Sequence, residues 1–274
     1  MCIRDSSYGV DATFSSFNNE VTDLVSAFQI GNGIPFAGTS ANRTQVGQPI
    51  ASFFGRVVDG IYRSEAEVAA GPDQGFTDAA SGVGRLRYVD LNDDGVINDD
   101  DRTFIGSPHA DFSYGVNLRA AYKGFDISAF ISGVEGNEIY NGDRVFTDFP
   151  TFFNGNRSDR VLDAFSSSNP EGSAPALSTL ITNQETQANS FFVEDGSFLR
   201  LKNLQIGYTL PQSLLENVGI SQLRFYVTGS NLATITDYTG LDPEIQPGNG
   251  NNALTLGLDV NLSLIHISEP TRPY

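Results

Sequence analysis

The most constraining feature of this sequence is a strict alternation of apolar and polar side chains. In FSYGVNLRAAY, residues 112–122, aromatic and aliphatic side chains occupy every second position, and the pattern resumes in residues 125–131 after Lys123 and Gly124. A period of two is that of a β-strand, because successive side chains point to opposite faces. Two alternating runs separated by two residues predict a β-hairpin with a very short turn.

Further alternating runs occupy residues 223–228 and 254–262. Several runs reach the length of about 9–11 residues that a tilted strand needs to cross a bilayer. Two architectures fit them: a soluble β-sandwich, whose apolar face meets a core, and a membrane β-barrel, whose apolar face meets lipid. In a barrel, the apolar residues of the last run are expected to face lipid: Leu254, Leu256, Leu258 and Val260.

Two further observations favour the barrel. Aromatic residues lie near the ends of the predicted strands, as an interfacial girdle requires: Phe112, Tyr114, Tyr122, Phe125 and Tyr208. The connections also alternate in length: residues 123–124 and 210–220 form short links, the second with one helical turn near Pro211, whereas residues 134–190 and 231–252 form long polar loops. Short turns on one side and long loops on the other are the layout of outer-membrane barrels.

The long loop at residues 134–190 contains four phenylalanines, Phe146, Phe149, Phe152 and Phe153. Such rings either stack on sugar rings or contact a partner, or they pack the loop on itself, and packing is the favoured interpretation.

The charge balance is strongly acidic. The sequence has 33 Asp+Glu against 16 Lys+Arg, which gives a formal net charge of −17. A surface of this sign repels nucleic acid, so no nucleic-acid partner is expected.

The two ends differ from the interior. Residues 1–6, beginning MCIRDS, and residues 263–274, ending SEPTRPY, resemble translated sequencing-adapter read-through, and the single Met and single Cys are Met1 and Cys2. We therefore expect residues 7–262 to carry the fold.

Residues 90–101, DLNDDGVINDDD, have the spacing of a calcium-binding loop. Oxygen ligands are expected at loop positions 1, 3, 5, 7, 9 and 12, which are Asp90, Asn92, Asp94, the Val96 carbonyl, Asn98 and Asp101. Gly95 stands where the chain must turn sharply, and the last ligand is Asp rather than the usual Glu. The alternative is a solvated acidic turn. We predict structural Ca²⁺ and no catalytic role for it.

Catalytic motifs do not emerge from this sequence. His109 is the one histidine of the interior, no nucleophile-elbow motif accompanies it, and no phosphate-binding glycine loop is found. His109 is interpreted as a loop residue, and we predict that the chain is not an enzyme.

Four ordered motifs resemble one known family, the SusC/RagA-type TonB-dependent outer-membrane receptors, in their C-terminal barrel part. They are VGQPIASFFGRVVDGIYRSEAEV (46–68), the acidic segment leading to FSYGVNL (84–118), FFVEDGSFLRLKNLQIGYTLP (191–211) and LRFYVTGSNLATITDYTGLDPEI (223–245). The sequence departs from the family pattern at His109. It departs again after residue 262, where the closing aromatic residue of the family is missing.

The resemblance implies an all-β fold, namely the C-terminal portion of a large antiparallel transmembrane β-barrel, here about nine strands with long extracellular loops, in a full barrel of about 22 strands. It implies an outer-membrane transporter that imports glycans or peptides with a SusD-like surface lipoprotein. The energy would come from the TonB complex through an N-terminal part missing here. Residues 90–101 would then lie in an extracellular loop. The alternative is a calcium-stabilised extracellular β-sandwich that acts as a binding or adhesion module.

Overall fold

The computed structural model of the chain describes residues 6–31, 40–150, 156–179, 184–215, 219–245 and 253–260. It divides into two compact units. Unit 1 comprises Met1–Asn18, Ala110–Asn137 and Asp195–Thr239, and unit 2 comprises Asn19–His109, Glu138–Glu194 and Gly240–Tyr274. Of the two adapter-like ends, all but Ser6 lies outside the described residues.

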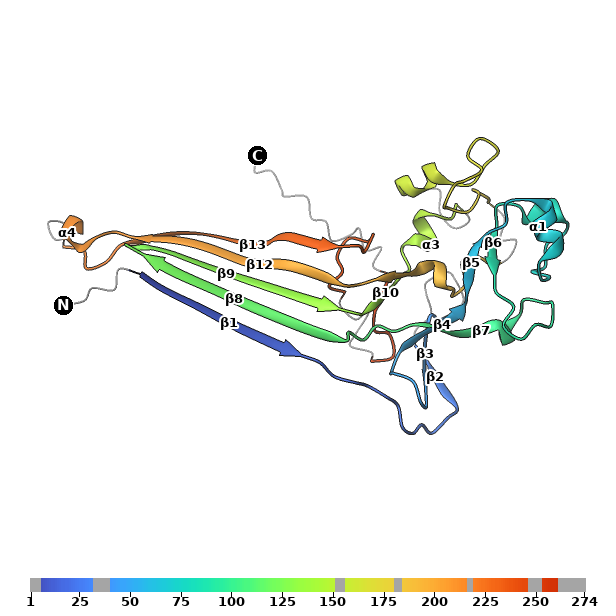
Figure 1. The fold of residues 1–274 in the computed structure, drawn as a ribbon, viewed down its shortest axis with the longest axis horizontal. Coiled ribbons are helices and arrows are strands. Elements are labelled where there is room, and N and C mark those ends of the chain that lie inside the picture. Colours follow the sequence, from blue (N-terminus) through green and yellow to red (C-terminus); the bar gives the residue numbers. More distant parts are fainter. Residues whose placement is uncertain are drawn as a thin grey trace, which may run out of the picture. The chain divides into compact units, whose positions relative to one another are not determined.

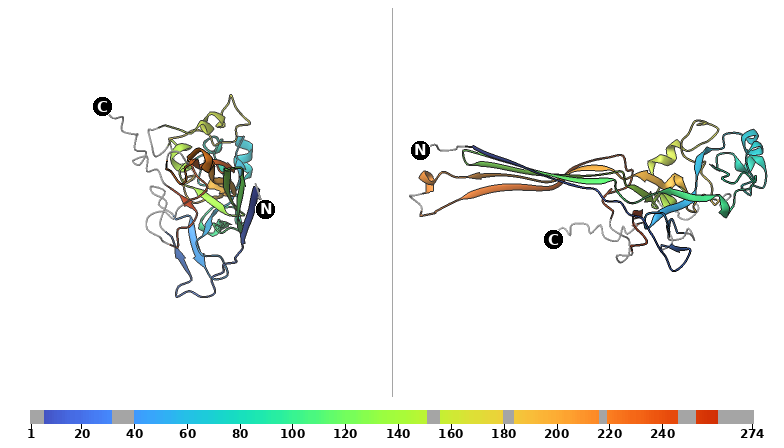
Figure 2. Two further views of the ribbon diagram at one scale, coloured as in Figure 1. Left: turned by 90° about the vertical axis from the view of Figure 1, so that its left-hand side faces the viewer. Right: turned by 60° about the horizontal axis from the view of Figure 1, so that its bottom comes forward.

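Unit 1 is a single antiparallel sheet of five long strands, in the order β1-β8-β9-β12-β13 (Figure 1, Figure 2). The strands are β1 (Ser6–Ser15), β8 (Phe112–Tyr122), β9 (Phe125–Glu135), β12 (Phe198–Thr209) and β13 (Arg224–Thr236). The predicted all-β, antiparallel class is therefore confirmed, although this sheet has five strands rather than the about nine expected of a barrel portion.

The predicted hairpin is confirmed. Tyr122 of β8 lies opposite Phe125 of β9, and Lys123 and Gly124 connect them with φ angles of 47° and 87°. Two successive positive φ angles give a tight turn whose twist matches that of the flanking strands, and glycine adopts such an angle without strain.

The connections of the sheet alternate in length as the sequence predicted. The turn at Lys123 and Gly124 and the link that carries α4 (Gln212–Leu215) join strands at one end. The helical turn near Pro211 is thus confirmed. Because the strands are antiparallel, residues 16–111 and 136–197 both leave from the opposite end, and they supply most of unit 2.

Unit 2 is built from short elements. Its largest sheet has the order β2-β3-β4-β7, with β2 (Phe28–Ile30), β3 (Asn42–Gln45), β4 (Ser52–Arg56) and β7 (Arg102–Gly106). Two smaller sheets are formed by β5 (Val58–Ile61) with β6 (Leu86–Tyr88), and by β11 (Val193–Asp195), β10 (Glu138–Asn141) and β14 (Leu258–Asp259). The helical segments are α1 (Glu65–Ala70), α2 (Ala79–Gly82), α3 (Arg144–Thr147), η1 (Asp99–Asp101), η2 (Asp159–Asp163) and η3 (Ser190–Phe192).

The core of unit 2 is rich in aromatic residues. Phe53 and Phe192 are fully buried, and Phe192 contacts Phe149 with ring centroids 5.8 Å apart. Phe146 and Phe149 are each 5% exposed, which confirms the interpretation that these rings pack the loop on itself. Phe152 and Phe153 lie outside the described residues.

Two predicted segments differ from the structure. The run at 254–262 was expected to be a long lipid-facing strand. In its described part, residues 254–260, only Leu258–Asp259 is a strand, paired in parallel with β10, and Leu258 is 4% exposed in the core of unit 2. The lipid-facing assignment of Leu258 is therefore wrong, and Val260 packs against the same core. Alternation is a local signal that does not select the pairing partner. A turn with Gly257 at φ 67° also interrupts the run just before Leu258.

The second difference concerns residues 231–236, which the sequence assigned to a long loop. In the structure, β13 continues to Thr236 because it pairs with β12 as far as Phe198. A register irregularity opposite Lys202, where Asn231 has φ 52°, absorbs the extra residue and lets pairing continue.

In the described part of the chain, no helix has both the length and the apolar character needed to span a membrane.

Candidate functional site

The loop at residues 90–101 folds back on itself. A carboxylate oxygen of Asp90 accepts a hydrogen bond from the backbone N–H of Gly95 at 2.7 Å, and Gly95 has φ 82°. Asp93 is also left-handed, at φ 58°. The chain thus folds back over its first ligand position, and glycine relieves the steric cost of the turn.

The other predicted ligands are linked to one another. Asp94 accepts from the backbone N–H of Val96 at 2.8 Å, and Asn92 donates its side-chain amide to Asp94 at 3.0 Å. The Asn98 amide donates to the Val96 carbonyl at 3.4 Å. The residues predicted from spacing therefore do lie in one compact loop.

Asp101 closes this loop. It is fully buried, and its two carboxylate oxygens accept backbone N–H groups from Leu91 at 2.9 Å and from Asn98 at 2.8 Å. The loop is also attached to a neighbouring segment, because Asp73 pairs with its backbone: the Asp73 N–H donates to the Gly95 carbonyl, and the Ile97 N–H donates to the Asp73 carbonyl, each at 2.8 Å.

The oxygen Oδ1 of Asp90 is buried and has no hydrogen-bond partner. A carboxylate oxygen in this position costs free energy unless a proton or a cation satisfies it. Among the described residues, no three His, Cys, Asp or Glu side chains gather as a metal site on their own. Asp90, Asp94 and Asp101 therefore do not converge on one point in this structure. A cation would need these carboxylates to move closer together, along with the amide oxygens and the Val96 carbonyl, and such a mixed oxygen set suits calcium.

His109 lies in the segment that joins β7 to β8, between Ser107 and Ala110. Its Nε2 lies 2.8 Å from the Ile50 carbonyl oxygen, and the residue belongs to an irregular segment, as the sequence predicted.

The long sheet of unit 1 has one continuous apolar face. The register places Val10 beside Leu118, Leu118 beside Ala129, and Ile127 beside Ile206 and Ala120. Large side chains on this face are exposed on all five strands: Tyr8, Val10, Phe14, Leu118, Tyr122, Phe125, Ile127, Ile206, Phe225, Val227 and Ile235.

Aromatic residues form a row at each end of this face. At the turn end, Tyr122, Phe125, Tyr208 and Phe225 lie side by side on successive strands, with the rings of Phe125 and Tyr208 4.4 Å apart. At the other end, Phe14 stacks on Phe112 at 5.4 Å, and Phe112 lies 6.2 Å from Tyr114. Along β8, the eight residue-to-residue steps from Tyr114 to Tyr122 separate the two rows by about 26 Å.

The opposite face of the sheet is mainly polar. Arg119 pairs with Asp11 at 2.5 Å, and Arg224 pairs with Asp126 at 2.5 Å. Phe130 is an exception with a local reason: its ring lies over Gly115, where a Cβ atom would come within 3.2 Å of it. The ring covers backbone that a glycine leaves bare.

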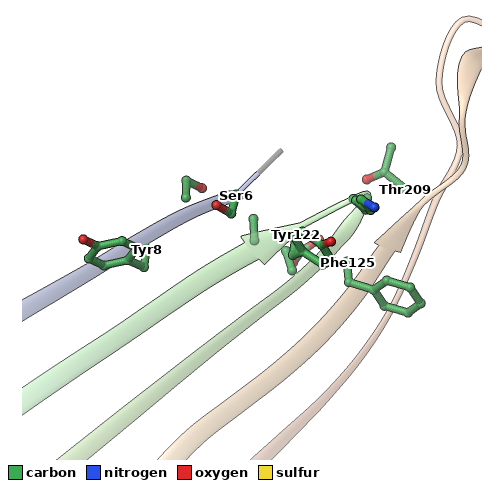
Figure 3. A pocket seen from close by; sticks show the side chains of 10 residues that line it. Ser6, Tyr8, Tyr122, Phe125 and Thr209 are labelled. Carbon is green, nitrogen blue, oxygen red and sulfur yellow. The ribbon is translucent and has the colours of Figure 1, made fainter. Parts of the chain in front are cut away.

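An open hollow of about 820 Å³ lies at the turn end of the sheet. Figure 3 shows Tyr8, Tyr122 and Phe125 there, extending from three successive strands. Apart from Lys123 and Asp126, its lining is uncharged, so it is the surface of the sheet between strand ends rather than a site with converging polar groups.

Comparison with known proteins agrees with this arrangement. No family model matches the chain. "TonB-dependent receptor P3" of Formosa agariphila is 36% identical over 222 residues, which are 78% of this chain and 21% of that protein. "TonB-dependent receptor SusC" of Bacteroides thetaiotaomicron is 28% identical over 165 residues, 59% of this chain and 15% of that protein. The solved structure of the RagAB peptide transporter matches with a TM-score of 0.65 and 26% identity, covering 89% of this chain and 25% of that one.

The chain is a segment of a SusC/RagA-type TonB-dependent receptor. It spans about a fifth of the length of the curated receptors that match it over most of its own length.

Sequence reasoning missed two arginine sites of this receptor segment. Arg85 and Glu185 form an ion pair at 2.9 Å in which both side chains are 5% exposed, and Glu185 also accepts the Leu86 N–H at 2.9 Å. The two residues are 100 positions apart, so no local pattern signals the pair. Arg43 lies between the rings of Phe28 and Phe54, and no spacing rule indicates such a stack.

Proposed function

We propose that this receptor segment forms part of the wall of an outer-membrane β-barrel that imports oligosaccharides or peptides. The observation that carries the proposal is the apolar face of the five-stranded sheet, bounded by two aromatic rows about 26 Å apart. An outer-membrane barrel has an outward apolar band about 25 Å tall between aromatic girdles, and its strands tilt by about 35–45°. A separation of about 26 Å along a strand then corresponds to about 20 Å of this height. The polar face, with its Arg119–Asp11 and Arg224–Asp126 pairs, would line the lumen.

The exposure of the apolar face argues against the β-sandwich alternative. A sandwich buries this face against a second sheet. Tyr8 is 91% exposed and Val227 is 78% exposed, which suits side chains that meet lipid rather than a protein core.

The comparisons support a role in transport. The matching RagAB structure is that of a peptide transporter, and one curated relative is the TonB-dependent receptor SusC. By this relation we infer that the full receptor captures its substrate with a SusD-like surface lipoprotein and draws energy from the TonB complex through a part outside this chain. No enzymatic step is required, because the transporter moves its substrate unchanged.

Two adjacent residues of β8 test the face assignment. Leu118 lies on the apolar face midway between the aromatic rows, and Asn117 lies on the polar face. In the full-length receptor, we expect Leu118→Arg to destabilise the barrel by about 2–4 kcal/mol, because a charge would enter the middle of the lipid. The measurement is the heating temperature at which the folded receptor converts to its unfolded gel mobility.

Asn117→Arg is the matched control, because it adds the same side chain one position away toward the lumen and should have a small effect. Tyr122→Arg, at an aromatic row, should cost only about 0–1 kcal/mol. Equal losses for Leu118→Arg and Asn117→Arg would contradict the membrane assignment.

We also propose that the loop at residues 90–101 holds one Ca²⁺ ion as a structural clip. The unsatisfied Asp90 Oδ1 is the observation that favours a cation. The ligands would be Asp90, Asn92, Asp94, the Val96 carbonyl, Asn98 and Asp101. Because Asp101 is followed directly by β7, the ion would fix the start of that strand and hence its pairing with β4.

The calcium proposal is tested by limited proteolysis of the full-length receptor. Calcium should protect residues 90–101 from cleavage relative to a chelator, and Asp90→Asn should abolish the protection. Asp93→Asn removes the same charge at a non-ligand position of the loop and should leave it intact. If cleavage is equally fast with calcium and with chelator, the loop is a solvated acidic turn.

A further inference from the structure

One face of the β2-β3-β4-β7 sheet in unit 2 carries arginines and aromatic rings. Phe28 of β2 and Arg43 of β3 project to the same side, since Phe28 lies opposite Gln45 and Ile30 lies opposite Arg43. Phe54 of β4 lies opposite Phe104 of β7 on this side, and Arg56 lies opposite Arg102. Arg56 shares this side but is buried and donates to Gln184 and Gln187. We define the arginine–aromatic face as the remaining residues, which are Phe28, Arg43, Phe54, Arg102 and Phe104.

Arg43 is clamped between two rings. Its guanidinium carbon lies 4.1 Å from the centroid of Phe28 and 4.2 Å from that of Phe54. The Phe54 ring is itself held by Phe104, at 5.3 Å and 70°. The two rings come from β2 and β4, the strands on either side of β3, so they restrict the movement of the guanidinium from both sides.

Arg43 lacks the acidic partner that such a residue usually has. Among the residues that the structure describes, no carboxylate lies within ion-pair distance of it, and its buried Nε–H has no hydrogen-bond acceptor. By contrast, Arg85 pairs with Glu185, Arg87 with Asp59 and Arg144 with Asp148. An unpaired guanidinium is unexpected in a chain whose net charge is −17, where acids are abundant.

A second positive charge lies nearby. The guanidinium carbon of Arg102 is 5.6 Å from the Phe54 ring, and its nearest acid is Asp99 at 3.6 Å, which is 82% exposed and shared with Arg56. Burial, and then the charge of Arg102, lower the pKa of Arg43. Both effects oppose the positive charge of Arg43, and the attraction of an anion placed against these two arginines would offset them.

We propose that Arg43 and Arg102, held in place by Phe28 and Phe54, form a subsite that binds a carboxylate group of the imported ligand. Guanidinium binds a carboxylate through two parallel N–H donors, and the Phe28 ring, 40% exposed, offers an apolar surface to the body of the ligand. A uronic-acid sugar and the C-terminus of a peptide share this chemistry. The proposal rests on the proposed import role only for the origin of the ligand.

The experiment is calorimetry with the purified full-length receptor in detergent, so that it needs neither a membrane nor transport. Two ligand pairs differ only in the charge: trigalacturonate with its methyl ester, and a free-carboxylate pentapeptide with its C-terminal amide. We expect one acid to bind more tightly than its neutral partner, which identifies the source of the carboxylate. Arg43→Gln should weaken binding of that acid by about tenfold or more and leave the neutral ligand unchanged.

Arg87→Gln is the matched control. Arg87 also lies near a ring, 6.0 Å from Tyr62, but it already pairs with Asp59, so its loss should not affect either ligand. Arg43→Lys keeps the charge without the planar pair of donors and should retain only part of the affinity. Phe28→Leu keeps both arginines and should weaken binding less than Arg43→Gln.

Two results would overturn the proposal. In the first, neither acid binds the unaltered receptor more tightly than its neutral partner. In the second, Arg43→Gln leaves acid binding unchanged but weakens co-purification with the surface lipoprotein, which would show that an acidic side chain of that protein meets Arg43. The Leu118→Arg comparison is independent of both results, so failure here is distinguishable from failure of the transport proposal.

Discussion

The carboxylate of Asp101 accepts the backbone N–H of Leu91 at 2.9 Å, although the two residues stand at opposite ends of the acidic loop. Its second oxygen accepts the N–H of Asn98, and the side chain is fully buried. Asp101 therefore holds the two ends of the loop together through its own hydrogen bonds, in addition to the ligand role proposed for it.

Replacing Asp101 by Ala should destabilise the loop by about 2–4 kcal/mol, because two backbone N–H groups lose their acceptor. The measurement is pulse proteolysis of the receptor in increasing urea, with cleavage mapped to residues 90–101. Asp100→Asn, at the exposed neighbouring position, should change stability by less than about 0.5 kcal/mol. Equal effects of the two variants would contradict the role of Asp101.

The buried Arg85–Glu185 pair should tolerate the loss of one charge poorly. Glu185→Gln keeps an oxygen for the Leu86 N–H but leaves Arg85 buried without its counter-charge, and we expect a loss of about 3–5 kcal/mol. Changing both residues, as Arg85→Met with Glu185→Gln, should recover part of the loss. Urea unfolding of the single and double variants checks this, and a double variant less stable than either single one would argue against the pair.

The side chain of Asp143 should make stability depend on pH. Burial, and then the charge of Asp259, raise the pKa of Asp143 from 3.8 to about 7. The folded state therefore holds a proton that the unfolded state releases, so stability falls as pH rises from about 4 to about 7 and is level above that. Asp143→Asn should be more stable than the parent at pH 8, and the difference should vanish near pH 4.

Asp163→Asn supplies a control of opposite sign. Hydrogen bonds from Ser173, and also from Asn169, lower the pKa of Asp163, so its contribution is present above its ordinary pKa and lost as pH falls. Urea unfolding of both variants across this pH range is the measurement. A difference for Asp143→Asn that grew toward low pH would show that the carboxyl is ionised in the folded state.

A side chain at position 133 should destabilise the sheet. Tyr114 lies directly opposite Gly133, and a Cβ atom there would collide with the Tyr114 ring. We expect Gly133→Val to destabilise the sheet by about 1–3 kcal/mol as the ring is displaced. The unfolding temperature of the folded receptor on gels measures this. Gly9→Ala, where the nearest atom would be 3.7 Å from the new Cβ, should be tolerated. An unfolding temperature unchanged by Gly133→Val would show that the ring moves aside without cost.

β8, β9 and the turn between them were predictable from sequence because their signals are local. Alternation over 112–131 gives the two strands, and Lys123 and Gly124 give the turn. The spacing of the acidic loop likewise predicted a compact loop, because the hydrogen bonds that fold it back join residues within twelve positions of one another. The prediction of a long lipid-facing strand at 254–262 was wrong because alternation is only a local signal. Pairing depends on which neighbouring strand is available, and Leu258 pairs with β10.

The sequence by itself determined the alternating faces of the strands, the acidic loop and the likeness to one receptor family, since each depends on residues close together in the chain. Only the tertiary structure decided that Arg85 meets Glu185 across 100 positions, and that Arg43 lies between two rings from other strands without an acid. Such contacts follow from strand register and loop packing, which bring distant residues together and leave no periodic trace in the sequence.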